Sequence, residues 1–317
     1  MRRRLDQLLK FRQLRMVEAL ARHQSVTRAA AALCLTQPAI TKMVRELEAI
    51  IGEPLFERHA RGVRPTECGL AVLRYARGAL ADLNRLEEEL NLKDGFGQAS
   101  VVVGALPVAA VGVLPAAIKR ARAEHPSLQI RLVEGQTEAL LAQLEAGEVD
   151  LVVGRLYPPL VPDSLVREPL YAEPISVMAR SAHPLQRLKR PTVKDLAGFD
   201  LVLPTFSQRI SQDIEQFMTA IGLEATAGSI RSTSRGFIRE MLLATDMVTV
   251  TPRMVMGGDL LRGQIRVLAV PTPVFSRPAG VITNPKRGDS AGGGLLIQIL
   301  RETIADLALS GDFDITR

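Results

Sequence analysis

The chain has 317 residues, long enough for two or three domains. Apolar residues make up 47% of it and charged residues 23%, an ordinary globular composition that excludes a disordered chain, a coiled-coil rod and a collagen-like protein. Its 40 lysines and arginines exceed its 34 aspartates and glutamates only slightly, for a net charge of +6.

No run of about 18 apolar residues occurs, so the sequence predicts no membrane-spanning helix. The basic start at Arg2 to Arg4 imitates the head of a signal peptide, but Asp6 and Lys10 interrupt the apolar stretch that should follow. The two cysteines, Cys34 and Cys68, are too few for a disulfide framework. Both lie in apolar helical contexts, where a buried thiol is expected, although a role as oxidant sensors stays open. We therefore expect a cytoplasmic protein.

The positive charge is concentrated at one end of the chain. Residues 1–65 contain 13 basic and 6 acidic side chains, residues 66–93 contain 4 and 5, and residues 94–317 contain 23 of each. The whole excess thus lies in the first fifth. This asymmetry indicates a basic terminal module for a polyanion, joined to a neutral body with another task.

Helical periodicity predicts three short helices in the basic module. The first runs from Phe11 to about His23, and the second covers residues 26–33 after Ser25 as its N-cap. Thr36 is expected to cap the third helix. The buried face of this third helix should consist of Ile40, Met43, Val44 and Leu47. A short helix, a turn and a second helix with a polar face are typical of a helix-turn-helix.

The opposite face of the third helix carries side chains suited to DNA. It presents Gln37 at its N-terminal tip, followed by Pro38, Thr41, Lys42 and Arg45. Glutamine can pair with adenine, threonine can touch a base edge, and arginine or lysine can bind guanine or phosphate. Residues 54–66 then predict two short strands around a turn at Gly62, a wing whose basic residues are Arg58, Arg61 and Arg64. We expect contact with double-stranded DNA; the alternative is a solvated helix face.

Two motifs in this region carry a family resemblance. They are SVTRAAAALCLTQPAITKMVRELE at residues 25–48 and GEPLFER at residues 52–58. Together they resemble the N-terminal domain of LysR-type transcriptional regulators, densely over about residues 8–90 and more loosely beyond. The resemblance implies a dimer or tetramer, contact with RNA polymerase, and a C-terminal effector-binding domain similar to type 2 periplasmic binding proteins. It also implies that the third helix meets the major groove. Pro65 departs from the family pattern at the end of the wing.

Residues 66–97 are expected to form a linker with one long helix and a hinge at its end. Apolar residues recur there at three- and four-residue steps: Leu73, Ala76, Leu80, Leu83, Leu86 and Leu90. This seam has coiled-coil width and favours dimerisation. The alternative is a helix that packs on its own domain. Residues 94–97 then end the helix and supply the hinge.

Residues 98–317 predict an α/β regulatory domain. A βαβαβ pattern is expected from strands at 101–104, 128–134 and 149–153 with helices at 114–124 and 137–146. A second set has strands at 200–203, 229–231 and 247–250 with helices at 208–221 and 234–244. Strands at 265–270 and 281–284 and a helix at 295–307 complete the pattern. Two lobes follow, residues 98–165 plus 271–317 and residues 166–270, with crossings near 166–171 and 269–273.

A ligand between such lobes should meet the carboxyl ends of strands and the starts of helices. That geometry nominates Leu106, Pro107, Val108, Gln136, Thr137, Arg155, Thr205, Phe206, Ser207, Arg209, Ser232 and Thr233. Any of them could instead serve as a helix cap or turn residue. Arg155 and Arg209 favour a carboxylate, sulfonate or phosphate. An uncharged sugar stays open, and residues 152–156 resemble a subgroup with regulators of sugar uptake and aromatic-acid breakdown.

The function predicted from these features is sequence-specific regulation of transcription, modulated by a small organic acid or sugar. An architectural DNA-binding protein without an effector and a DNA-tethered α/β enzyme are the alternatives. No nucleotide-binding glycine loop and no zinc-ligand spacing occur, so no cofactor or metal is expected. Gly288 to Gly293 approaches the nucleophile sequence of trypsin-like proteases but has an inserted Ala291 and no supporting histidine pattern. We therefore do not expect an enzyme.

Overall fold

The computed structural model describes residues 8–59, 62–93, 98–156, 164–273, 275–288 and 290–310. The chain forms two compact units: Met1–Gln98 with Glu145–Glu148, and Ala99–Leu144 with Val149–Arg317. We call them the first and second units and describe each by itself. Within these described ranges, none of the helices combines the length and the apolar character that crossing a membrane requires.

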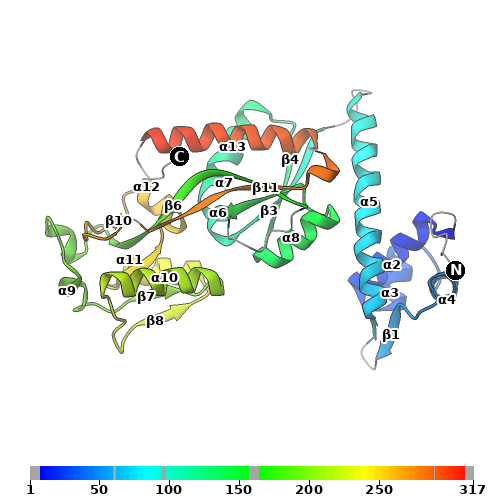
Figure 1. Ribbon diagram of the computed structural model, residues 1–317, viewed down its shortest axis with the longest axis horizontal. Helices are drawn as coiled ribbons and strands as arrows, with labels where there is room; N and C mark the ends of the chain where they lie inside the picture. Colours follow the sequence, from blue (N-terminus) through cyan, green and yellow to red (C-terminus); the bar gives the residue numbers. More distant parts are fainter. Residues whose placement is uncertain are drawn as a thin grey trace. The chain divides into compact units, whose positions relative to one another are not determined.

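The first unit has the predicted order of helices, hairpin and long helix (Figure 1). Its elements are α2 (Phe11–His23), α3 (Val26–Ala32), α4 (Gln37–Ile51), β1 (Phe56–His59), β2 (Gly62–Pro65) and α5 (Glu67–Lys93). The side chains of Ser25 and Thr36 accept hydrogen bonds from the backbone N–H groups of Arg28 and Ala39, which confirms both predicted N-caps.

The core of the first unit explains the alanine-rich second helix. Ala29 and Ala30 are buried, and their small side chains let α3 pack closely against its neighbours. Ile40, Met43 and Leu47 form the buried face of α4, as predicted, while Val44 is only partly buried. The core thereby fixes which side of α4 remains exposed.

Helix α5 differs from the predicted seam in its first half. Leu73 and Ala76 are buried within the first unit, where α5 packs against α2. That part follows the alternative of a helix on its own domain. Farther along, Leu86 and Leu90 are half-exposed. The apolar stripe with exposed members therefore has a different membership at four- and three-residue steps, in which Ala79 and Leu83 are partly buried: Tyr75, Ala79, Leu83, Leu86 and Leu90.

Cys34 corrects another expectation. It is exposed in the turn after α3, with a left-handed φ of 54°, rather than buried on a helix. The turn takes the thiol out of the apolar face that the sequence pattern suggested. Cys68 is partly buried near the start of α5.

The second unit is α/β, as predicted (Figure 1). Its first elements are β3 (Ser100–Ala105), α6 (Pro107–Val111), α7 (Val113–Glu124), β4 (Gln129–Glu134), α8 (Thr137–Ala146), β5 (Leu151–Arg155) and β6 (Val166–Arg180). Then come η1 (Pro184–Arg187), α9 (Val193–Leu196), β7 (Val202–Pro204), α10 (Gln208–Ile221), β8 (Ile230–Ser232) and α11 (Arg235–Ala244). The last are β9 (Thr249–Pro252), η2 (Arg253–Met256), α12 (Gly257–Leu261), β10 (Ile265–Val267), β11 (Ser276–Thr283), η3 (Pro285–Arg287) and α13 (Ala291–Ser310).

The strands form two lobes that share β6. In the first lobe β4, β3 and β5 are parallel, and β11 joins β5 and β6 in antiparallel pairing. In the second lobe β7 and β8 are parallel, while β9 and β10 pair with the end of β6. The carboxyl ends of β4, β7 and β8 are followed by helices that begin near the cleft between the lobes.

The crossings between the lobes lie later than the sequence predicts. Residues 166–174 of β6 still pair with β11 in the first lobe, and the strand enters the second lobe only at Ile175. Residues 269–273 form no strand, and the return crossing is near Phe275, whose carbonyl accepts a hydrogen bond from the N–H of Ile175. One continuous strand serving two sheets replaces the short extended segment that we expected.

Candidate functional site

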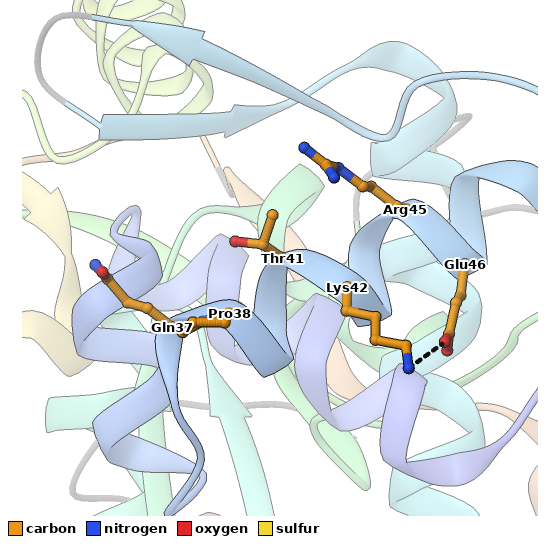
Figure 2. A pocket seen from close by; sticks show the side chains of 6 residues that line it. All are labelled: Gln37, Pro38, Thr41, Lys42, Arg45 and Glu46. Atoms are coloured by element: carbon orange, nitrogen blue, oxygen red, sulfur yellow. Dashed lines mark ion pairs between the residues drawn. The ribbon is translucent and has the colours of Figure 1, made fainter.

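The exposed face of α4 forms a shallow hollow of about 460 Å³. It is lined by Gln37, Pro38, Thr41, Lys42, Arg45 and Glu46 (Figure 2). The structure thus brings together all five predicted side chains of this helix. Glu46, which directly follows Arg45, was not predicted, although a carboxylate can accept a hydrogen bond from cytosine.

Two contacts order the polar side chains on this face. The amide of Gln37 donates to the hydroxyl of Thr27 on α3, which ties the tip of α4 to the preceding helix. The ammonium of Lys42 lies 3.9 Å from the carboxylate of Glu46 (Figure 2). Since this lysine side chain is 79% exposed, the pair is weak and leaves Lys42 available to another anion.

The hairpin of β1 and β2, which we call the wing, is fixed to the helices by backbone contacts. The N–H of Val63 donates to the carbonyl of Gln24 at 3.0 Å. Glu48 on α4 accepts from the N–H groups of Leu55 at 2.8 Å and Phe56 at 3.4 Å. This role of Glu48 was not predicted from the sequence, because its partners are backbone groups that no motif marks.

Of the three predicted wing arginines, the structure describes the positions of Arg58 and Arg64. Arg58 lies on β1 and lines a second hollow, of about 280 Å³, together with Thr41, Arg45 and Glu48. Arg64 is exposed on β2. Arg61 lies outside the described residues. The second hollow thus places Arg58 of the wing beside Thr41 and Arg45 of α4.

A second candidate site lies between the lobes of the second unit. It is a cavity of about 440 Å³ lined by Pro107, Glu134, Gln136, Phe206, Thr233, Ser234, Arg235 and Gly236. Four of these were predicted: Pro107, Gln136, Phe206 and Thr233. The other four lie within three positions of nominated residues, so the strand-end rule found the place but not all of its chemistry. The polar side chains that the strand-end rule nominated were mainly cations and hydroxyls. The rule did not nominate Glu134 at the end of β4.

Two side chains of the cavity lining, Arg235 and Gln136, make polar contacts between the lobes. Arg235 at the start of α11 donates to both carboxylate oxygens of Glu134, at 3.0 and 2.9 Å, and to the carbonyl of Pro107 at 3.1 Å. The amide of Gln136 donates to the carbonyl of Phe206 at 3.0 Å. Outside the cavity lining, Arg209 lies 3.6 Å from Glu138. The contacts of Arg235 and Gln136 are polar contacts at the cavity that a ligand could replace.

The other predicted cleft residues have different surroundings. Leu106 and Val108 are buried in the apolar cores. Ser207 caps α10, and the hydroxyl of Ser232 accepts from the N–H of Ser234. These two serines thus follow the alternative of helix caps and turn residues. The predicted cleft residues that do not line the cavity are Leu106, Val108, Thr137, Arg155, Thr205, Ser207, Arg209 and Ser232.

The position of Arg155 differs from the prediction that its side chain faces a ligand between the lobes. Its side chain is 2% exposed and pairs with Glu173 and, at 2.7 Å, with Asp213. Arg277 also reaches Asp213, at 2.8 Å. Burial raises the pKa of Glu173, and the charge of Arg155 only partly offsets this. Because the strand that carries Arg155 is buried on both sides, the guanidinium pairs with carboxylates of β6 and α10 instead of facing the cavity.

Comparison with protein families gives two matches that together cover most of the chain. Residues 11–70 match the model of bacterial regulatory helix-turn-helix proteins of the lysR family. Residues 95–305 match the model of the LysR substrate binding domain. The first match contains the α4 face and the wing, and the second contains the cavity.

Comparison with known proteins agrees with these matches. The chain is 33% identical over 303 residues to the HTH-type transcriptional regulator PcaQ of Agrobacterium fabrum, covering 96% of this chain and 97% of that protein. It is 30% identical over 306 residues to the HTH-type transcriptional regulator GalR of Pseudomonas putida, covering 96% and 75%. Full-length CbnR, solved in complex with its target DNA, shares the fold with a TM-score of 0.68 at 18% identity, covering 93% of this chain and 100% of that one.

Proposed function

Because this chain belongs to the LysR family of bacterial regulatory helix-turn-helix proteins, we propose that the exposed face of α4 reads bases in the major groove of its DNA target. The protein is a transcriptional regulator with a helix-turn-helix domain and a substrate-binding domain. The observation that supports the proposed contact is the convergence of Gln37, Thr41, Lys42 and Arg45 on one exposed helix face beside an anchored basic wing.

Individual roles follow from the chemistry of the side chains. Gln37, Thr41, Lys42 and Arg45 contact base edges, and Pro38 packs against the groove wall. Arg58, Arg61 and Arg64 bind phosphates and so position the module rather than read sequence. The net charge of +7 on residues 1–65 supplies the electrostatic part of the affinity.

Pairing of two chains follows from the exposed stripe on α5. Tyr75, Ala79, Leu83, Leu86 and Leu90 form a seam for a second copy of the chain, whose two modules then read paired half-sites. The residues 66–97 act as the linker between the DNA-binding module of residues 1–65 and the regulatory domain of residues 98–317. The regulator works in the cytoplasm, where it reaches both DNA and RNA polymerase.

The cavity between the lobes binds the effector, a small organic acid or a sugar. Its size and its mixture of Phe206 with amide, hydroxyl and charged groups suit such a molecule. Ligand binding favours one arrangement of the lobes, and through it one spacing of the paired DNA-binding modules. The coupling is limited by the difference in the ligand's affinity for the two arrangements.

Footprinting on the DNA that flanks the protein's own gene tests this function. We expect a protected, sequence-specific site whose extent changes when a ligand of the cavity is added. A footprint that no cavity-binding ligand alters would overturn the coupling. Weak sequence preference against competitor DNA would favour an architectural protein instead. A DNA-tethered enzyme has no support from a family of transcriptional regulators.

A further inference from the structure

Among the arginine ion pairs that join the lobes, the pairs of Arg155 and Arg235 differ in their degree of burial. Arg155 pairs with Asp213 of the second lobe deep in the protein, with side chains that are nearly fully buried. Arg235 pairs with Glu134 of the first lobe at the cavity, where the two side chains are 29% and 42% exposed. Removing one partner of a buried pair leaves an uncompensated charge, whereas an exposed pair contributes a factor of about five or less in an equilibrium constant. Only the second pair is easily exchanged.

Arg235 has the geometry of a carboxylate-binding site that the side chain of Glu134 already occupies. Both oxygens of Glu134 accept from the guanidinium, at 3.0 and 2.9 Å, which is the bidentate arrangement that a free carboxylate would adopt. The side chain of Phe206 lies beneath, with its ring centre 5.8 Å from Cζ of Arg235. Glu134 and Arg235 are the charged members of the cavity lining, and their charges cancel.

We propose that Glu134 is an internal competitor for the effector, and that the effector is a small carboxylic acid which displaces it from Arg235. This inference rests on the proposed function of the cavity as the effector site. Glu134 is attached to β4 of the first lobe and Arg235 to α11 of the second, so their pair ties the lobes together. When a diffusible carboxylate takes the place of Glu134, that tie is replaced by contacts with the ligand. Binding thereby acts on the arrangement of the lobes.

Direct binding to the full chain without DNA tests the exchange. The probes are benzoate and succinate, with benzamide and succinamide as uncharged analogues, measured by calorimetry on the wild type and on Glu134→Gln, Arg235→Gln and Glu138→Gln. Glu138 is an exposed carboxylate that pairs with Arg209 outside the cavity lining, so Glu138→Gln is the matched control.

We expect at least one of the two acids to bind Glu134→Gln about three- to tenfold more tightly than the wild type, because the competing charge is gone. Glu138→Gln should match the wild type, and Arg235→Gln should lose the acid. The amides should bind the wild type and Glu134→Gln equally. The proposal is overturned if neither acid binds Glu134→Gln at about 10 mM, if the acid binds the wild type equally well, if Arg235→Gln retains it, or if the amides gain as much.

Footprinting with the same variants separates this inference from the proposed function. All three variants should protect the DNA site without ligand, because the α4 face is unchanged. If the acids bind as expected and the footprint never responds, the exchange stands and the coupling to DNA fails. If another ligand changes the footprint while Glu134→Gln gains no affinity for the acids, the regulatory function stands and the exchange is overturned; a sugar that binds without Arg235 is such a case.

Discussion

The buried position of Arg155 gives this residue a role in stability. It lies between the carboxylates of Glu173 and Asp213, and a neutral substitute leaves both with less compensation. We expect Arg155→Met to lower the free energy of unfolding by about 3–5 kcal/mol. The matched control is Arg231→Met, because Arg231 pairs with Glu215 at the surface. This substitution should change the free energy of unfolding by about 1 kcal/mol or less. Urea denaturation measures both, and equal losses would contradict the structural role.

The raised pKa of Glu173 predicts a pH dependence of stability. Burial is its main cause, and the folded chain therefore holds this proton more readily than the unfolded chain. The contribution of Glu173 to stability is thus fully present below the unfolded pKa and is lost as the pH rises through the raised folded pKa. Glu173→Gln, which keeps an acceptor for Arg155, should remove this dependence. Urea denaturation at several pH values checks it: the stability of the wild type relative to Glu173→Gln should fall as the pH rises.

At the scale of single residues, the sequence predicted the α4 face well and the cleft only in part. Gln37, Thr41 and Arg45 lie on one side of a helix whose buried side is marked by apolar spacing, so their exposure follows from periodicity alone. Arg155 is the last residue of β5 and Arg235 is the first residue of α11, and local pattern does not distinguish their burial. Only the tertiary packing of β5 against β6 and α10 makes one of them buried.

The placement of the wing depends on Gly62. A Cβ at this position would lie 2.1 Å from the carbonyl oxygen of Gln24, and its φ of 134° disfavours any other residue. We expect Gly62→Ala to lower the free energy of unfolding by about 1–3 kcal/mol and to weaken DNA binding, because the hairpin must shift. Gly222→Ala is the control: it shares a positive φ but has no atom within 4 Å of its Cβ. In denaturation, Gly222→Ala should show only the loss of stability that backbone strain causes, and in DNA titration its affinity should be unchanged. Weakened DNA binding in Gly222→Ala would refute the explanation.

Helices were easier to predict than strands. α8 and α10 have the predicted bounds, and in α10 an N-cap at Ser207 and a C-cap at Gly222 mark the two ends. Residues 166–171 were predicted as a short crossing between the lobes, whereas β6 runs from Val166 to Arg180 although it contains Pro169 and Pro174. The structure accommodates Pro169 beside an irregularity in the pairing with β11 and Pro174 where the strand changes sheets. This pairing of β6 depends on residues more than 100 positions away in the sequence. A local sequence pattern does not contain that information.

The assembly of the molecule should depend on the exposed stripe of α5. Leu86 lies on the stripe and is 50% exposed, so a charge there would be buried in the seam between two chains. We expect Leu86→Glu to reduce the molecular mass in solution and to weaken DNA binding, because paired half-sites need paired modules. Asn84 is exposed on the same helix but off the stripe, which makes Asn84→Glu the control. Light scattering distinguishes them, and an intact oligomer in Leu86→Glu would place the seam elsewhere.

The uneven distribution of charge predicts where salt acts on the whole molecule. Each phosphate contact releases counterions, so the logarithm of DNA affinity falls with the logarithm of salt in proportion to the number of contacts. Arg64 is exposed on the wing, and Arg64→Ala should reduce that slope by about one. Arg231→Ala removes an exposed arginine from residues 94–317, whose charges sum to zero, and should leave the slope unchanged. Fluorescence anisotropy across a salt series measures both slopes. Similar reductions in the two variants would mean that DNA also contacts the second unit, and that the charge of residues 1–65 does not mark the whole interface.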